Sequence, residues 1–337
     1  MGEPGPFGFG LAVHADWSLH PAKRWMTVAT WRGGVWLAGA PEPVGEAGSL
    51  LGRLRRRAAG RHVGFGIDCP LGLPRAYVRR HCTDILGFRH FLAGLENRPA
   101  LFDVCGRLDE VNGSRPFFPR HGKLGMTRAS HAAALGLADA ASLSRVCDRA
   151  TPTRAPGAPL FWTLGANQSG KAAIAAWRDL IVPALREPDP ALYLWPFDGD
   201  VAQLAIAFAA RPGAAGVLLA ETYPAEALDQ LGLRLTKAAG RGSKRRQGDR
   251  AGLAGGLRRA MDDAAMTPSA SLRAALLDGF GADTAGEDRF DSLLGLLCVV
   301  SVLDGRRLDG VPDDPWIRDW EGWVLGLRAS SLPASVA

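Results

Sequence analysis

The first 75 residues constrain the fold most, because apolar segments and turn signals follow one another there in a clear order. Residues 7–18, FGFGLAVHADWS, form an apolar run that ends in polar residues. Residues 24–34, RWMTVATWRGG, are rich in β-branched and aromatic residues and end in a glycine pair. That pair predicts a hairpin to a partner strand in residues 35–41, VWLAGAP.

A helix and a fourth strand complete this region. Leu50, Leu51 and Leu54 have helical spacing, and Gly60 follows as a stop signal. Residues 61–68, RHVGFGID, then form a short apolar strand before a proline-rich turn. A helical crossover places the fourth strand parallel to the first, so the order predicts a mixed α/β sheet.

The rest of the chain divides into a long irregular stretch and a second regular region. Twelve prolines interrupt residues 72–213, and we expect residues 76–213 to form a large insertion packed on the core. Regular patterns return in a strand and helix at 216–233 and in a long apolar helix within 283–307. We therefore expect one domain over residues 1–337, with a core at 8–75 and 214–328 and a flexible tail at 329–337.

Carboxylates follow the apolar strands. Asp16 ends the first strand and Asp68 ends the fourth, and parallel neighbours bring such side chains to one sheet edge about 4.8 Å apart. Two acids at that separation repel each other unless a cation lies between them, and oxygen ligands suit Mg²⁺ or Mn²⁺. Glu221 ends a later strand in the same way.

A fourth acid lies on the last long helix. Thr284 and Glu287 have the spacing of a capping box, which would start this helix. Asp291 then falls in the second turn, on an otherwise apolar face, and a buried carboxylate there needs a partner.

Each acid also has a purely structural interpretation. Asp16 and Asp68 suit turns with Ser18 and before Pro70, and Glu221 and Asp291 suit the first turns of helices. We favour a joint site because all four acids occupy comparable places in one strand and helix order.

The segments that carry these acids resemble the family catalogued as domain of unknown function 429. The shared segments are HADWSLHPAKRW, GIDCPLGLP, ETYPAE, DRFDSLLGLLCVVSVLDGRR, FWTLGANQSGKA, LWPFDGD, GSKRRQGDR and EGWVLG. The family is regarded as predicted nucleases with an RNase H-like fold. The resemblance implies a five-stranded RNase H-like sheet with a large insertion after the fourth strand. It also implies that Asp16, Asp68, Glu221 and Asp291 bind metal and catalyse hydrolysis.

Two further segments suggest anion contacts. GANQSGKA, residues 165–172, resembles a phosphate-binding P-loop, but Ala172 replaces the hydroxyl residue that holds Mg²⁺. We therefore expect a turn that places Lys171 near the acids and a substrate phosphate. The basic loop at 242–250 suits backbone phosphates, although a solvated basic loop is an equal alternative. Its candidate residues are Lys244, Arg245, Arg246 and Arg250.

Composition sets the remaining limits. A net charge of +6 permits an anionic partner without requiring one, and no apolar run is long enough to cross a bilayer. Five scattered cysteines and the lack of a signal-peptide pattern suit a cytoplasmic protein. Protein partners cannot be assigned from the sequence.

The sequence thus predicts an Mg²⁺- or Mn²⁺-dependent nuclease that hydrolyses phosphodiester bonds in nucleic acid or another phosphoester substrate. Two alternatives remain open. One is an actin-like ATP-binding or phosphotransfer protein, and the other is a non-catalytic nucleic-acid-binding module.

Overall fold

The computed structural model describes residues 6–122, 126–152, 154–165, 169–187, 191–210, 215–235 and 242–329. Within these ranges the strands are β1 (Phe9–Asp16), β2 (Trp25–Arg32), β3 (Val35–Ala38), β4 (Glu42–Pro43), β5 (His62–Ile67), β6 (Leu192–Leu194), β7 (Val217–Glu221) and β8 (Met266–Pro268). The α-helices are α1 (Leu50–Ala58), α2 (Arg75–His81), α3 (Phe88–Ala93), α4 (Arg128–Ala134), α5 (Ser169–Ala176), α6 (Val182–Arg186), α7 (Val201–Ala209), α8 (Pro224–Gln230), α9 (Gln247–Ala251), α10 (Ala254–Asp263), α11 (Ala270–Asp278) and α12 (Gly286–Leu303).

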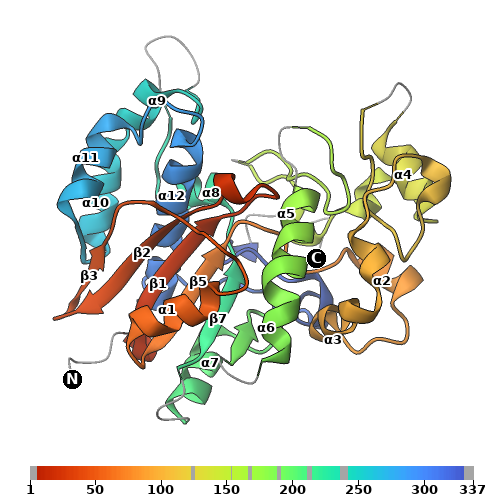
Figure 1. The fold of residues 1–337 in the computed structure, drawn as a ribbon, viewed down its shortest axis with the longest axis horizontal. Helices are drawn as coiled ribbons and strands as arrows, with labels where there is room; N and C mark the ends of the chain where they lie inside the picture. The colour runs from red at the N-terminus through yellow and green to blue at the C-terminus, as the bar shows by residue number, and fades with distance from the viewer. Residues whose placement is uncertain are drawn as a thin grey trace.

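The described strands form one mixed sheet in the order β6-β7-β5-β1-β2-β3-β8, with β4 paired to β2 (Figure 1). β1, β2 and β3 are antiparallel neighbours, whereas β5 runs parallel to both β1 and β7. The predicted mixed sheet and the parallel pairing of the first and fourth long strands are therefore confirmed. The sheet has eight strands, whereas the sequence predicted five. β4, β6 and β8 were not predicted because each has only two or three residues, too few to show an alternating apolar pattern.

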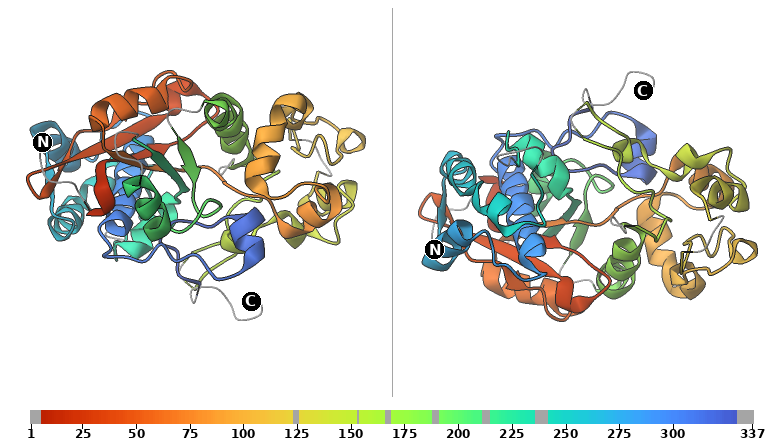
Figure 2. Two further views of the ribbon diagram at one scale, coloured as in Figure 1. Left: turned by 90° about the horizontal axis from the view of Figure 1, so that it is seen from below. Right: turned by 90° about the horizontal axis from the view of Figure 1, so that it is seen from above.

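Each face of the sheet has its own helices and its own apolar core. Val13, Phe65 and Leu219 pack with α1 and α5 on one face, and Ala12, Leu218 and Ala220 pack with α12 on the other. Figure 2 shows α1 and α12 on opposite sides of the strands. Successive side chains of a strand point to opposite faces of the sheet. Two acids can therefore meet only where their positions place them on the same face.

Of the elements between β5 and β6, α2, α3 and α4 lie beside the sheet rather than on it, on the side far from β3 (Figure 1). The predicted insertion at 76–213 nevertheless contains β6, which pairs with β7 as part of the sheet. Of the predicted tail at 329–337, residues 330–337 lie outside the described residues.

The long helix α12 packs across β1, β2 and β5. It begins at Gly286 after the N-cap Ala285, and no side chain caps it, so the predicted capping box of Thr284 and Glu287 is wrong. Its closest approach to the sheet is at Gly295, where an added Cβ would lie 2.3 Å from ring atoms of His14 on β1. The helix can therefore reach the sheet only because this position has no side chain.

We expect Gly295→Val to destabilise the protein by about 1–3 kcal/mol, because the new side chain must push α12 away from the His14 ring. Thermal and urea unfolding would measure the change.

A matched control is Gly52→Ala in α1, where an added Cβ meets only the tip of the Arg56 side chain at 3.7 Å. This change should stabilise the helix by up to about 1 kcal/mol. Equal stabilities of the two variants would contradict the close packing of α12 on β1.

Candidate functional site

Three of the four predicted acids meet at one end of the sheet. Asp16 is the last residue of β1, and Asp68 follows β5 with its backbone N–H donating to the carbonyl of Ala15 at 3.0 Å. Asp16 lies two residues after His14, and Asp68 lies two residues after Gly66. Because side chains alternate along a strand, both aspartates lie on the face of the sheet that α12 covers. Asp291 in the second turn of α12 completes the group.

These acids lie in a cleft of about 800 Å³. Four basic side chains share its lining, namely Lys23, Lys171, Lys244 and Arg245. Two further acids, Glu287 and Asp288, line it from the first turn of α12. The cleft therefore combines a carboxylate cluster with several cations, an arrangement that suits a substrate with phosphate groups.

The carboxyl groups of Asp16 and Asp68 are neighbours, and each affects the pKa of the other. Burial, and next the charge of Asp291, together raise the pKa of Asp68 to about 7. Burial and the neighbouring Asp68 also hold the pKa of Asp16 well above its usual range. The pair can therefore take up or release a proton near neutral pH.

Lys244 compensates the third acid. Its Nζ lies 2.5 Å from Oδ2 of Asp291, whereas Oδ1 of Asp291 is buried and has no hydrogen-bond partner among the described residues. Burial raises the pKa of Asp291, and the ammonium of Lys244 opposes that shift. One oxygen of Asp291 is thus available to a further ligand.

The other predicted basic residues differ in their positions. Lys171 and Arg245 line the cleft, as the substrate-binding prediction requires. Arg246 pairs with Asp249 at 2.7 Å. Arg250 is only 2% exposed, and it donates to backbone carbonyls instead of facing the cleft. Arg250 is therefore placed to support the basic loop and not to contact substrate.

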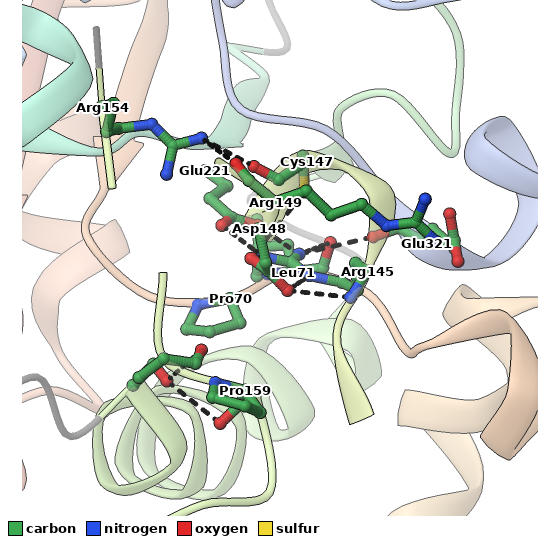
Figure 3. Close-up of polar contacts among 12 residues, drawn as sticks. Pro70, Leu71, Arg145, Cys147, Asp148, Arg149, Arg154, Pro159, Glu221 and Glu321 are labelled. Carbon is green, nitrogen blue, oxygen red and sulfur yellow. Dashed lines mark hydrogen bonds and ion pairs between the residues drawn. The ribbon is translucent and has the colours of Figure 1, made fainter. Parts of the chain in front are cut away.

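Glu221 does not join the acids in the cleft. It pairs in register with Ile67, so its side chain projects from the opposite face of the sheet to Asp68. There Arg145 donates two hydrogen bonds of 2.6 Å to its carboxylate, as Figure 3 shows. No sequence pattern indicates this difference, because Glu221 ends its strand much as Asp68 follows β5, and only the alternation of side chains along the strand separates the two acids.

Arg145 holds the turn that follows Asp68. It is fully buried and also donates to the carboxylate of Asp148 and to the carbonyl of Leu71. Glu221 accepts a 2.7 Å hydrogen bond from the Leu71 N–H. The Arg145–Glu221 pair thus fixes both backbone groups of a residue three positions beyond Asp68.

Sequence reasoning missed several residues of this region. Asp288 lies one helical turn before Asp291, and that spacing was a readable signal. No sequence pattern marks Arg145 or Lys23, which come from irregular segments.

The P-loop interpretation finds little support. Residues 166–168 of this motif lie outside the described residues, and the described stretch just before it, 159–165, contains no β-strand. Lys171 lies in the first turn of α5, so a helix does follow the motif, but the strand that a P-loop requires is lacking.

The acids were tested as metal ligands. Within the described ranges, no three His, Cys, Asp or Glu side chains are grouped closely enough to hold a metal ion. Asp16, Asp68 and Asp291 therefore do not form a ready-made metal site, although Asp16 and Asp68 are neighbouring carboxyls with the oxygen donors that a hard cation prefers. None of the described helices has the length and apolar content needed to cross a membrane.

Comparison with protein-family models, with curated proteins and with solved structures found no match.

We expect Arg145→Met to destabilise the protein by about 3–5 kcal/mol, because it leaves the Glu221 carboxylate buried without its cation. Adding Glu221→Gln should restore part of the loss, and urea unfolding of both single variants and the double variant would measure the coupling. Arg178→Met, which breaks an exposed pair with Asp179, should cost at most about 1 kcal/mol. Purely additive effects of the Arg145 and Glu221 changes would refute the pairing.

Asp68 should make the metal-free protein lose stability as pH rises. An acid whose pKa is about 7 when folded and near 3.8 when unfolded binds more protons in the folded state between those values. Its stabilising contribution is therefore complete below about pH 4 and is lost as pH rises through 7.

Urea unfolding in EDTA at pH 4–8 should show this loss in the wild type and a smaller loss in Asp68→Asn. Asp84→Asn, which changes an exposed aspartate, is the control. Identical pH profiles for the wild type and Asp68→Asn would disprove the assignment.

Proposed function

We propose that this protein is a metal-dependent hydrolase of phosphodiester bonds, with nucleic acid as its substrate. The observation that carries the proposal is the meeting of Asp16, Asp68 and Asp291 at one end of the sheet, in a cleft that basic side chains also line. In this proposal the carboxylates bind the divalent cation and the basic residues bind the substrate phosphate. The cleft therefore contains side chains for both binding functions.

The fold supports the same proposal. Three antiparallel strands, a crossover helix and then strands parallel to the first occur in the order predicted for an RNase H-like core, which we assign to β3-β2-β1-β5-β7. α12 supplies an acid to the ends of these strands. We therefore retain the resemblance to the family of domain of unknown function 429 as part of the proposal.

The electrostatics of the cleft favour an anionic substrate. The first turns of α5 and α12 line it, and helix N-termini carry partial positive charge. Lys23, Lys171 and Arg245 add full charges at the same surface. These basic groups line the same cleft as the carboxylates.

Each side chain then has a defined task. Asp16 and Asp68 would hold a divalent cation, with Asp291 nearby, and the cation would supply an activated water and stabilisation of charge on the leaving oxygen. A bound cation would favour the ionised carboxylates, so Asp68, whose pKa is raised to about 7, would release a proton when the cation binds at neutral pH. Lys171 would orient a phosphate oxygen.

A small phosphorylated substrate is the second candidate. The cleft volume of about 800 Å³ falls within the range of small-molecule sites, so ATP or another nucleotide would also fit.

We expect the purified protein to cut DNA or RNA oligonucleotides with Mg²⁺ or Mn²⁺, and Asp68→Asn to lower the rate at least about 100-fold by removing a cation ligand. Gel assays of single- and double-stranded substrates would measure this, with the exposed Asp84→Asn as control. Lys171→Ala should chiefly raise KM.

Cleavage that survives Asp68→Asn would rule out the carboxylate site. If neither protein cuts nucleic acid but the wild type hydrolyses ATP or small phosphoesters, the second candidate replaces the first.

A further inference from the structure

We propose that the cleft binds an unpaired nucleotide, with its base stacked on the ring of Tyr223 and its phosphate held by Lys171 and Arg245. This inference rests on the proposed function, since it concerns the same cleft. It adds a substrate class, single-stranded rather than double-stranded nucleic acid, which the acids and the basic residues alone do not define.

The lining of the cleft has an apolar part as well as a charged part. Its apolar and aromatic residues include Trp17, Leu19, Pro70, Ala172, Tyr223 and Pro224. A phosphate group makes no use of such a surface, whereas a nucleobase does, because its flat face packs favourably on apolar and aromatic side chains. The two parts of the lining therefore match the two parts of a nucleotide.

Tyr223 is well placed to contact a base. It follows β7 and is the N-cap residue of α8, so the end of the sheet fixes its backbone. Its side chain is half-buried, whereas Trp17 is only 5% exposed. Burial, and next the charge of Asp68, raise the pKa of the Tyr223 hydroxyl, and Arg154 and Lys244 lower it. Tyr223 therefore lies near both the acids and the basic loop.

One face of the Tyr223 ring is covered from within the protein. The guanidinium of Arg154 lies over the ring, 5.1 Å from its centroid. Arg154 is buried and pairs with Glu226 at 3.1 Å. It also donates to the carbonyls of Cys147 and Arg149, as Figure 3 shows. Because Arg154 does not line the cleft, the ring is held in place from behind and the cleft meets the rest of its surface.

The phosphate has partners in the same cleft. Lys171 and Arg245 line it, and neither forms an ion pair with another described residue. Lys244, in contrast, is engaged by Asp291 at 2.5 Å. Two cations are therefore available to a phosphate group in the cleft that Tyr223 also lines.

The size of the cleft favours a single strand over a duplex. A volume of about 800 Å³ is that of a small-molecule site, which admits part of a single strand. In a duplex each base is paired and stacked on its neighbours, so its face is not available to Tyr223. Taking a base out of a duplex costs free energy, and an unpaired base avoids that cost.

The test is nucleic-acid binding in EDTA, where the proposed cleavage cannot occur. Fluorescence anisotropy would measure the affinity for a labelled single-stranded oligonucleotide and for the matching duplex, with AMP as a competitor. We expect the wild type to bind the single strand at least about tenfold more tightly than the duplex. Tyr223→Leu should lower the affinity for the single strand about tenfold, as expected for the loss of one stacked base, whereas Tyr223→Phe keeps the ring and should bind normally.

Trp316→Leu is the matched control. Trp316 is also a half-buried aromatic residue with arginine side chains, Arg75 and Arg79, over its ring, but it does not line the cleft. Its replacement should leave the affinity for the single strand unchanged.

Equal affinities for the two forms, no binding of either by the wild type, or unchanged binding by a folded Tyr223→Leu would overturn the inference. The wild-type comparison decides even if Tyr223→Leu does not fold, which circular dichroism would show. Competition by AMP as strong as that of the unlabelled single strand would support the unpaired nucleotide but identify it as a free one.

Binding needs no cleavage, so the two proposals can fail separately. A single strand that binds through Tyr223 but is not cut with Mg²⁺ or Mn²⁺ would remove only the hydrolase proposal. A duplex cut as fast as a single strand, by both the wild type and Tyr223→Leu, would remove only the inference about the unpaired nucleotide.

Discussion

The close packing of α12 on the sheet is the contact on which the candidate site depends. Gly295 lets the helix approach His14 on β1, and Gly64 and Gly66 on β5 leave room for Leu303 and Val299 of the same helix. Larger side chains at these positions would lift α12 off the strands. Asp291 would then move away from Asp16 and Asp68, and the cleft would lose its carboxylate cluster. The glycines thus affect the site through distance and not through contact with a ligand.

Buried negative charge on both faces of the sheet requires local compensation. On the α12 face, the raised pKa values of Asp16 and Asp68 favour their neutral forms, and Asp291 pairs with Lys244. On the other face, Arg145 neutralises Glu221 with two hydrogen bonds and also binds Asp148. The first arrangement leaves a carboxylate oxygen unpartnered and faces a cleft, whereas the second satisfies its carboxylate within the protein. This difference separates a candidate reactive cluster from a structural one.

The sequence predicted where the strands end, but it did not predict to which face of the sheet each acidic side chain points. Apolar runs that end in Asp16 and Asp68 predicted both the parallel pairing and the meeting of these acids. Glu221 follows the same rule along the chain, but a one-residue difference in strand alternation turns it to the opposite face. Arg145 and Arg250 were beyond reach, because their partners are carboxylates and carbonyls from distant segments. Such contacts depend on tertiary packing and leave no periodic pattern in the sequence.

Arginine and lysine have different tasks around the carboxylates. Arg145 and Arg250 each bridge several backbone or carboxylate oxygens, which the planar guanidinium with its five donors can do without moving. They fix the turn after Asp68 and the start of the loop that carries Lys244. Lysine offers a compact charge on a flexible stem, which suits a position that must balance an acid and still adjust when a cation or phosphate arrives. The site is therefore rigid in its backbone, through buried arginines, and adaptable in its charges, through lysines.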